Sequence, residues 1–217
     1  AIVGSINDGE VYRFINKPWD NAALHNVVAE AVTIALELAD TKSTAISLPA
    51  KMNAAVLVIA PDEDIFRVTR ELIGTLCPVL YASDSEAAML ILQQQEVAVV
   101  VADVEASQIE LTSMLKLLKQ ETPQILTIVT TKKADSELVI ELINQAQVFR
   151  ILSKPINVAL LKEHVHAALQ RYLSYKQTPK LLKSHQVQTV SAVRESNVGL
   201  RILDNLKAFR GKWFGAA

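Results

Sequence analysis

Four polar side chains, Asp62, Asp103, Thr130 and Lys154, end or closely follow short apolar runs of the sequence. They supply two carboxylates, a hydroxyl and an ammonium. A lysine and a hydroxyl can donate charge-assisted hydrogen bonds to an anionic group, and carboxylate oxygens are the ligands that Mg2+ prefers. The four residues lie far apart in the chain, so any joint chemistry requires a fold that brings the ends of these runs together.

Apolar runs rich in β-branched residues alternate with amphipathic stretches between residues 54 and 176. The predicted strands are residues 56–59, 78–81, 97–102, 125–130 and 148–152, and the predicted helices cover about 62–73, 85–94, 108–120, 135–145 and 161–175. This alternation is typical of a parallel sheet with helices on both sides. Ligands of such sheets bind beyond the carboxyl ends of the strands. We therefore expect the four polar side chains at that edge.

The beginning of the chain is repeated later in the sequence. Residues 1–38 align without a gap on residues 138–175, with eleven identical positions, and Lys17–Pro18 falls on Lys154–Pro155. An offset of 137 residues is too long for a solenoid repeat and suits a duplicated domain. We expect residues 1–42 to be the C-terminal part of a first domain, 43–53 a linker, 54–176 a complete second copy, and 177–217 a helical tail or a linker to an output domain. Because the chain starts inside the first copy, we expect it to be a piece of a longer protein.

The residues at the predicted strand ends resemble those of the receiver domain of bacterial two-component response regulators. That resemblance implies an α/β fold, a (βα)5 flavodoxin-like doubly wound parallel sheet with strand order 2-1-3-4-5. It also implies that Asp103, in VAVVVADVEAS, is the phosphoacceptor position, that Thr130 contacts the phosphoryl oxygens, and that Lys154 is the cation before the family's proline, Pro155.

The first copy carries part of the same pattern. Its segment VYRFINKPWD, which contains Phe14, Lys17 and Pro18, is similar to the fifth strand of these regulators. The second copy has Ile151 where the first has Phe14, so the aromatic switch residue of the family is absent there.

The acidic pair that holds Mg2+ in the family is replaced by Ala60 and Pro61. Asp62 and Asp103 are then the candidate Mg2+ ligands, although a proline beside Asp62 restricts the backbone shift that this would need. Loss of the metal removes a stabilisation of several kcal/mol from phosphoryl transfer. We therefore expect a degenerate receiver with impaired phosphorylation at Asp103, which is no enzyme and at most an aspartyl phosphoacceptor.

Two alternatives remain open from the residues alone. One is a working Mg2+-dependent phosphoacceptor that uses Asp62, and the other is a flavin- or nucleotide-binding protein on the flavodoxin-like fold. The chain has six glycines, none of them in a phosphate-binding loop, which argues against the second alternative.

Composition narrows the partners and the compartment. The net charge of −1 argues against a nucleic-acid-binding protein as a whole. A single cysteine cannot form an internal disulfide, so we expect a cytoplasmic protein. The expected partners are a sensor histidine kinase or other signalling proteins, and a second copy of the chain bound through the fourth helix, fifth strand and fifth helix. Residues 198–214 predict a basic amphipathic helix that could contact a membrane or nucleic acid, although docking on a partner domain is the commoner role.

Overall fold

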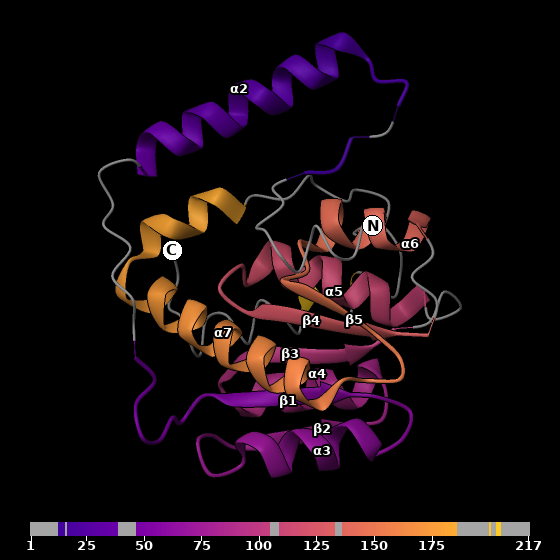
Figure 1. Ribbon diagram of the computed structural model, residues 1–217, viewed down its shortest axis with the longest axis vertical. Coiled ribbons are helices and arrows are strands. Elements are labelled where there is room, and N and C mark those ends of the chain that lie inside the picture. The colour runs from indigo at the N-terminus through magenta and orange to yellow at the C-terminus, as the bar shows by residue number, and fades with distance from the viewer. Residues whose placement is uncertain are drawn as a thin grey trace.

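The computed structural model describes residues 13–15, 17–38, 47–104, 109–132, 136–185, 200 and 203–204. Five parallel strands form one sheet in the order β2-β1-β3-β4-β5 (Figure 1). Their bounds are β1 Ala55–Ile59, β2 Val79–Ala82, β3 Val97–Asp103, β4 Leu126–Thr131 and β5 Arg150–Ser153. Every residue of β1, β3 and β4 is buried, as expected of the central strands of a parallel sheet that helices cover on both faces. The predicted fold class and strand order are confirmed.

Helices cover both faces of the sheet. Helices α3 (Asp64–Ile73) and α7 (Val158–Gln177) pack on one face, where Val56 and Val58 of β1 point. Helices α4 (Ser85–Gln94), α5 (Ile109–Glu121) and α6 (Ser136–Glu141) cover the other face, where Leu57 and Ile59 point. Figure 1 shows α7 lying across the strands. This alternation of side chains along β1 is the period-two geometry of a strand and builds two separate apolar cores.

The predicted helix over 135–145 is interrupted. Helix α6 passes into a π-helix, η1 (Leu142–Ala146), which ends at Gln147 in the left-handed region with φ of 41°. Such wide turns are uncommon and occur often at functional sites. Periodicity in the sequence does not reveal them, because the apolar residues Leu142, Ile143 and Ala146 remain buried. The other predicted elements are shifted by a few residues at most.

Helix α2 (Asn21–Leu38) is the first copy's counterpart of α7, and it lies apart from the sheet (Figure 1). Val28 and Val32 are 52% and 51% exposed, whereas their counterparts Val165 and Leu169 are 1% and 0% exposed. The same apolar stripe is therefore buried in one copy and largely uncovered in the other.

After α7, the chain forms a 3-10 helix, η2 (Pro179–His185), which contacts α2. Most of the predicted basic helix over 198–214, and residues 43–46 of the predicted linker over 43–53, lie outside the described residues. Of the tail, Leu203 is buried in the core beneath α4, α5 and α6.

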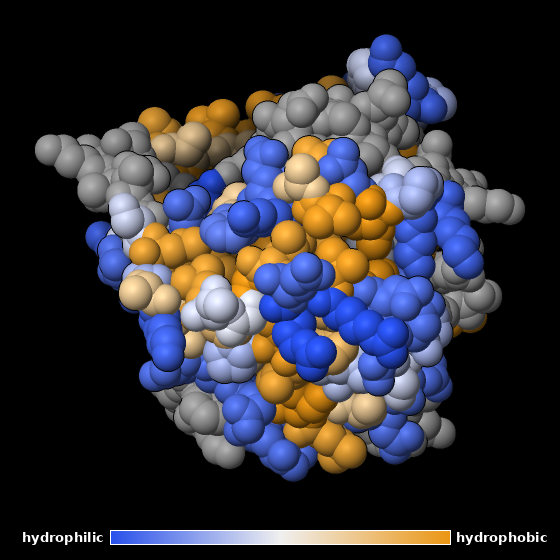
Figure 2. Space-filling model, turned by 60° about the horizontal axis from the view of Figure 1, so that its bottom comes forward, coloured by the Kyte–Doolittle hydropathy of each residue, from blue (hydrophilic) through white to orange (hydrophobic). Residues whose placement is uncertain are grey.

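The surface on the side of α3 mixes hydrophobic and hydrophilic areas, as Figure 2 shows. Such mixing is normal, since more than half of a protein's accessible surface is apolar. Within the part of the chain that the structure describes, no helix is both long and apolar enough to cross a membrane.

Candidate functional site

The register of the strands brings the predicted site residues together. Asp103 ends β3 and is the register partner of Thr130 on β4. Ser153 ends β5 opposite Thr131, and the next residue, Lys154, donates its backbone N–H to the carbonyl oxygen of Thr131 at 2.9 Å. These three strand ends are adjacent because β4 lies between β3 and β5. The carboxyl edge of the sheet thus collects side chains that are distant in sequence.

Both oxygens of the Asp103 carboxylate are engaged. The hydroxyl of Thr130 donates to Oδ1 at 3.0 Å, and Nζ of Lys154 donates to Oδ2 at 2.5 Å. The Asp103 side chain is 2% exposed and that of Lys154 is 19% exposed, while Thr130 is fully buried. Burial of a carboxylate requires such compensation. The three side chains therefore form a charge-compensated cluster at the edge of the sheet.

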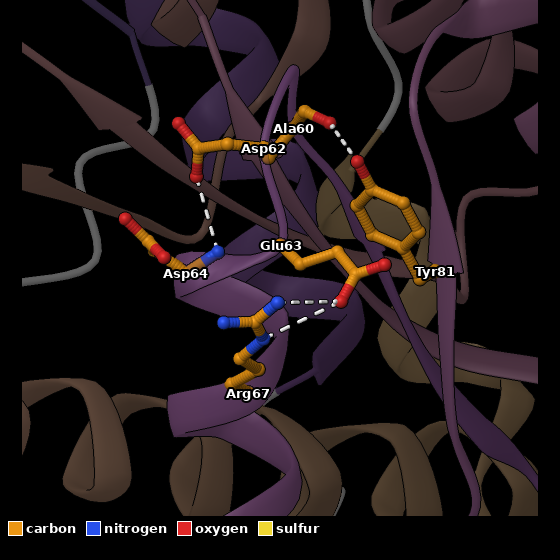
Figure 3. A network of polar contacts seen from close by, with 6 residues as sticks. All are labelled: Ala60, Asp62, Glu63, Asp64, Arg67 and Tyr81. Carbon is orange, nitrogen blue, oxygen red and sulfur yellow. Dashed lines mark hydrogen bonds and ion pairs between the residues drawn. The ribbon is translucent and has the colours of Figure 1, made fainter.

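Asp62 lies two residues before the start of α3. Its Oδ1 accepts the backbone N–H of Asp64 at 3.1 Å, as Figure 3 shows. In the same view Glu63 pairs with Arg67, and the hydroxyl of Tyr81 donates to the carbonyl oxygen of Ala60 at 3.0 Å. Asp62 is exposed and is used by the helix that follows it. The sequence predicted a helix from about residue 62 and also allowed Asp62 as a metal ligand, because an aspartate at a strand end and one at a helix start look alike.

A hollow of about 330 Å³ lies beside Asp103 at the ends of β1 and β3. Its lining residues are Ile59, Ala60, Pro61, Ser83, Asp84, Ser85, Asp103, Ile109, Glu110 and Leu111. Asp62 is not among them.

Sequence reasoning missed Ser83, Asp84 and Glu110. Asp84 could have been found, because it follows β2 with only Ser83 between and caps α4 by accepting the backbone N–H of Ala87 at 2.8 Å. That hydrogen bond holds the pKa of the Asp84 carboxyl below its ordinary value.

The donors around the hollow fit Mg2+ poorly. The ion requires near-octahedral oxygen ligands, whereas the end of β1 offers a methyl group at Ala60 and a ring at Pro61. One oxygen of Asp103 accepts a hydrogen bond from the Lys154 ammonium, and Asp62 accepts one from the backbone N–H of Asp64 at the start of α3. Among the residues that the structure describes, no three His, Cys, Asp or Glu side chains lie together as a metal-ligand group.

The first copy's counterparts of Ile151 and Lys154, which are Phe14 and Lys17, do not lie at the carboxyl edge of the sheet. Phe14 packs against the core beneath α4, α5 and α6, where its counterpart Ile151 is fully buried in β5. The ammonium of Lys17 lies 5.3 Å from the centre of the Trp19 ring. The peptide bonds before Pro18 and before Pro155 are both cis. The first copy thus keeps the cis peptide bond of the site. Among the described residues, Lys17 has no carboxylate partner like the one that Asp103 gives Lys154.

Comparison of the chain with known proteins gives its family. The family model described as response regulator receiver domain matches residues 56–166. The receiver domain of an HD domain-containing protein from Pseudomonas fluorescens is 25% identical, covers 57% of this chain and 99% of its own length, and has a TM-score of 0.52.

Two further solved structures share the fold. A receiver domain protein from Methanospirillum hungatei is 19% identical over 56% of this chain and 98% of its own, with a TM-score of 0.51. An uncharacterised protein from Neptuniibacter caesariensis is 21% identical over 59% of this chain and 96% of its own, with a TM-score of 0.53. No curated protein matches the chain.

Proposed function

Because the chain belongs to the response regulator receiver family of two-component signalling, we propose that residues 54–176 form a degenerate receiver that binds signalling partners and is phosphorylated poorly at Asp103. Receiver domains are in general non-enzymatic signalling modules that interact with histidine kinases and other signalling proteins. We propose such a partner here, in the cytoplasm, with residues 1–42 as the end of a first receiver.

The observation that carries this proposal is the state of the Asp103 carboxylate. Its oxygens hold Thr130 and Lys154, while the neighbouring positions 60 and 61 lack carboxylates. Phosphoryl transfer is catalysed mainly by positioning and by cations that neutralise the transferring charge. Lys154 is the one cation in contact with Asp103 in the described part of the chain, and it already compensates that carboxylate. A transferring phosphoryl group would therefore meet too little positive charge.

The test is exposure to a small-molecule phosphodonor with Mg2+, followed by intact mass measurement. We expect the wild-type chain to gain little or no phosphoryl group. A variant with Ala60→Asp and Pro61→Asp restores the acidic pair and should gain one, which Asp103→Asn added to that variant should remove. If the wild-type chain acquires a labile phosphoryl group that Asp103→Asn abolishes, the proposal is wrong.

A phosphoacceptor that relies on Asp62 makes a different prediction. Asp62→Asn keeps the oxygen that accepts the Asp64 N–H and removes the charge that a metal would need. If the wild-type chain is phosphorylated and Asp62→Asn is not, Asp62 is a metal ligand and the alternative is correct.

We also propose self-association, driven by the apolar stripe of α2. Val28, Val32 and Leu36 are 52%, 51% and 71% exposed, although the matching stripe of α7 packs on the sheet. Since burial of apolar side chains is favourable by about 25 cal/mol per Å², a second copy of the chain is the simplest cover. Sedimentation should show a concentration-dependent dimer that Val32→Lys weakens. Equal monomer sedimentation at all concentrations would refute self-association.

A further inference from the structure

The side chain of Asn144, in η1, holds the backbone of Phe14 with both of its polar atoms. The Phe14 N–H donates to Oδ1 of Asn144 at 2.8 Å, and Nδ2 of Asn144 donates to the carbonyl oxygen of Phe14 at 2.9 Å. The guanidinium of Arg13 also donates to the backbone carbonyl oxygen of Asn144 at 2.8 Å. All three hydrogen bonds are partly buried. One amide side chain thus pairs with the N–H and C=O of a single residue, as a neighbouring strand does.

The repeat explains why Phe14 requires such a partner. Its counterpart in the second copy, Ile151, lies in β5 in register with Val129 of β4. Phe14 lies in no strand of the sheet, yet its ring packs against the apolar core. Backbone groups brought that close to a core must be paired. Asn144 supplies at this point the hydrogen bonds that a fourth strand supplies in the second copy.

The π-helix fixes Asn144 in position to do so. Its neighbours Leu142, Ile143 and Ala146 are buried in the same core, which anchors the turn while Asn144 stays half-exposed. Asparagine carries an acceptor and a donor on one planar group. Both are used here, so an aspartate of the same shape would place an oxygen against the Phe14 carbonyl oxygen.

We propose that the η1 turn is a docking site for an extended backbone segment, that its occupant is the Arg13–Phe14 segment of the same chain, and that Asn144 determines the fit. Three parts of the segment are recognised: the backbone of Phe14, its side chain, which packs against the core, and the guanidinium of Arg13, which donates to the turn. This docking covers part of the surface that η1 presents. A partner that binds there must displace the first copy. The contact involves neither Asp103 nor the hollow, so its test is independent of the phosphorylation test.

The test is hydrogen–deuterium exchange at the Phe14 amide, measured by NMR on the full chain carrying Asn144→Asp. The substitution removes one hydrogen bond and opposes two oxygens, so we expect the Phe14 amide to exchange about tenfold faster or more. The amides of β1 and β3 should keep their wild-type rates, because the sheet is untouched.

Asn157→Asp is the matched control. Asn157 caps α7 with Oδ1 alone, which accepts from Ala159 and Leu160. The first copy has Asp20 at the equivalent position, where it caps α2 by accepting from Ala23 at 2.7 Å. The same chemical change at this position should leave the Phe14 exchange rate unaltered.

Phe14→Ala provides a second variant outside the second copy, in case Asn144→Asp fails to fold. It removes the ring from the core, and the amide of residue 14 should again exchange faster. The proposal is wrong if this amide exchanges at the same rate in the wild-type chain and in the folded variants at residues 144 and 14. It is also wrong if the amide of the wild-type chain exchanges as fast as in an unstructured peptide.

Discussion

Lys119 is a buried ammonium whose removal should stabilise the protein. It lies on α5 and is 3% exposed, and its Nζ donates to the carbonyl oxygen of Pro123 at 2.9 Å. Burial lowers the pKa of Lys119 from 10.5 to about 7, because a charge is poorly solvated away from water. The substitution Lys119→Met keeps a long flexible side chain and removes the charge.

The size of the effect follows from that pKa. The interval from 10.5 to 7 is 3.5 pH units, and each unit corresponds to about 1.4 kcal/mol. Burial of the protonated group therefore costs at most about 5 kcal/mol of unfolding free energy. Loss of the hydrogen bond to Pro123 offsets about 1 kcal/mol or more. We expect Lys119→Met to gain about 2 to 4 kcal/mol at pH 7.

The gain should depend on pH in one direction. Between pH 7 and 10.5 the unfolded chain keeps the Lys119 proton that the folded chain has released. The unfolding free energy of the wild-type protein therefore rises with pH in this window. The advantage of Lys119→Met should be largest at pH 7 and below, and should shrink towards pH 10.

Urea unfolding followed by circular dichroism at pH 7 and pH 9.5 measures both effects. Lys116→Met is the control on the same helix, because the Lys116 ammonium is paired with the carboxylate of Glu141. Its loss should bring no comparable gain. If Lys119→Met is no more stable than the wild-type protein at pH 7, or if its gain is equal at both pH values, the reasoning about burial is refuted.

Two further predictions concern ionisable groups. Lys154→Met should lower the unfolding free energy by about 3 to 5 kcal/mol, because it leaves the buried Asp103 carboxylate uncompensated; adding Asp103→Asn should recover most of the loss in urea unfolding, and no recovery would contradict the pairing. Burial, with a contribution from the charge of Arg150, lowers the pKa of His164, so the unfolded chain binds that proton first as the pH falls. Stability should therefore decline below about pH 6.5, and His164→Val should flatten the decline in thermal unfolding between pH 7 and 5; an unchanged slope would count against it.

The sequence alone predicted the sheet and the central cluster. The alternating apolar runs predicted the strands and helices in their order along the chain. Because the carboxyl ends of parallel strands lie at one edge of the sheet, the sequence also predicted that Asp103, Thr130 and Lys154 lie close together. The prediction succeeded there because strand ends are marked by a change from apolar to polar residues. Those ends are then brought together by hydrogen-bond register.

Two other features could not be settled by sequence patterns, one because a residue had two possible partners and one because the partners are far apart in the chain. Asp62 could point towards a metal or cap a helix, and it hydrogen-bonds to α3. The contact between Asn144 and Phe14 joins residues separated by 130 positions and depends on a π-helix that leaves no periodic signal. The one hint in the sequence was that the asparagine recurs as Asn7 in the repeat, a residue outside the described part of the chain.

The pairing of Asp103 with Lys154 has a consequence for how the domain responds to ionic conditions. Dissolved ions weaken attraction between charges mainly where water separates them, and the carboxylate here is 2% exposed. Potassium or magnesium salts at cellular concentrations should therefore leave the cluster intact. Exposed pairs such as Arg67 with Glu63, whose side chains are 66% and 50% accessible, should loosen under the same conditions. The edge of the sheet should keep one shape while the charged surface around α3 adapts to its surroundings.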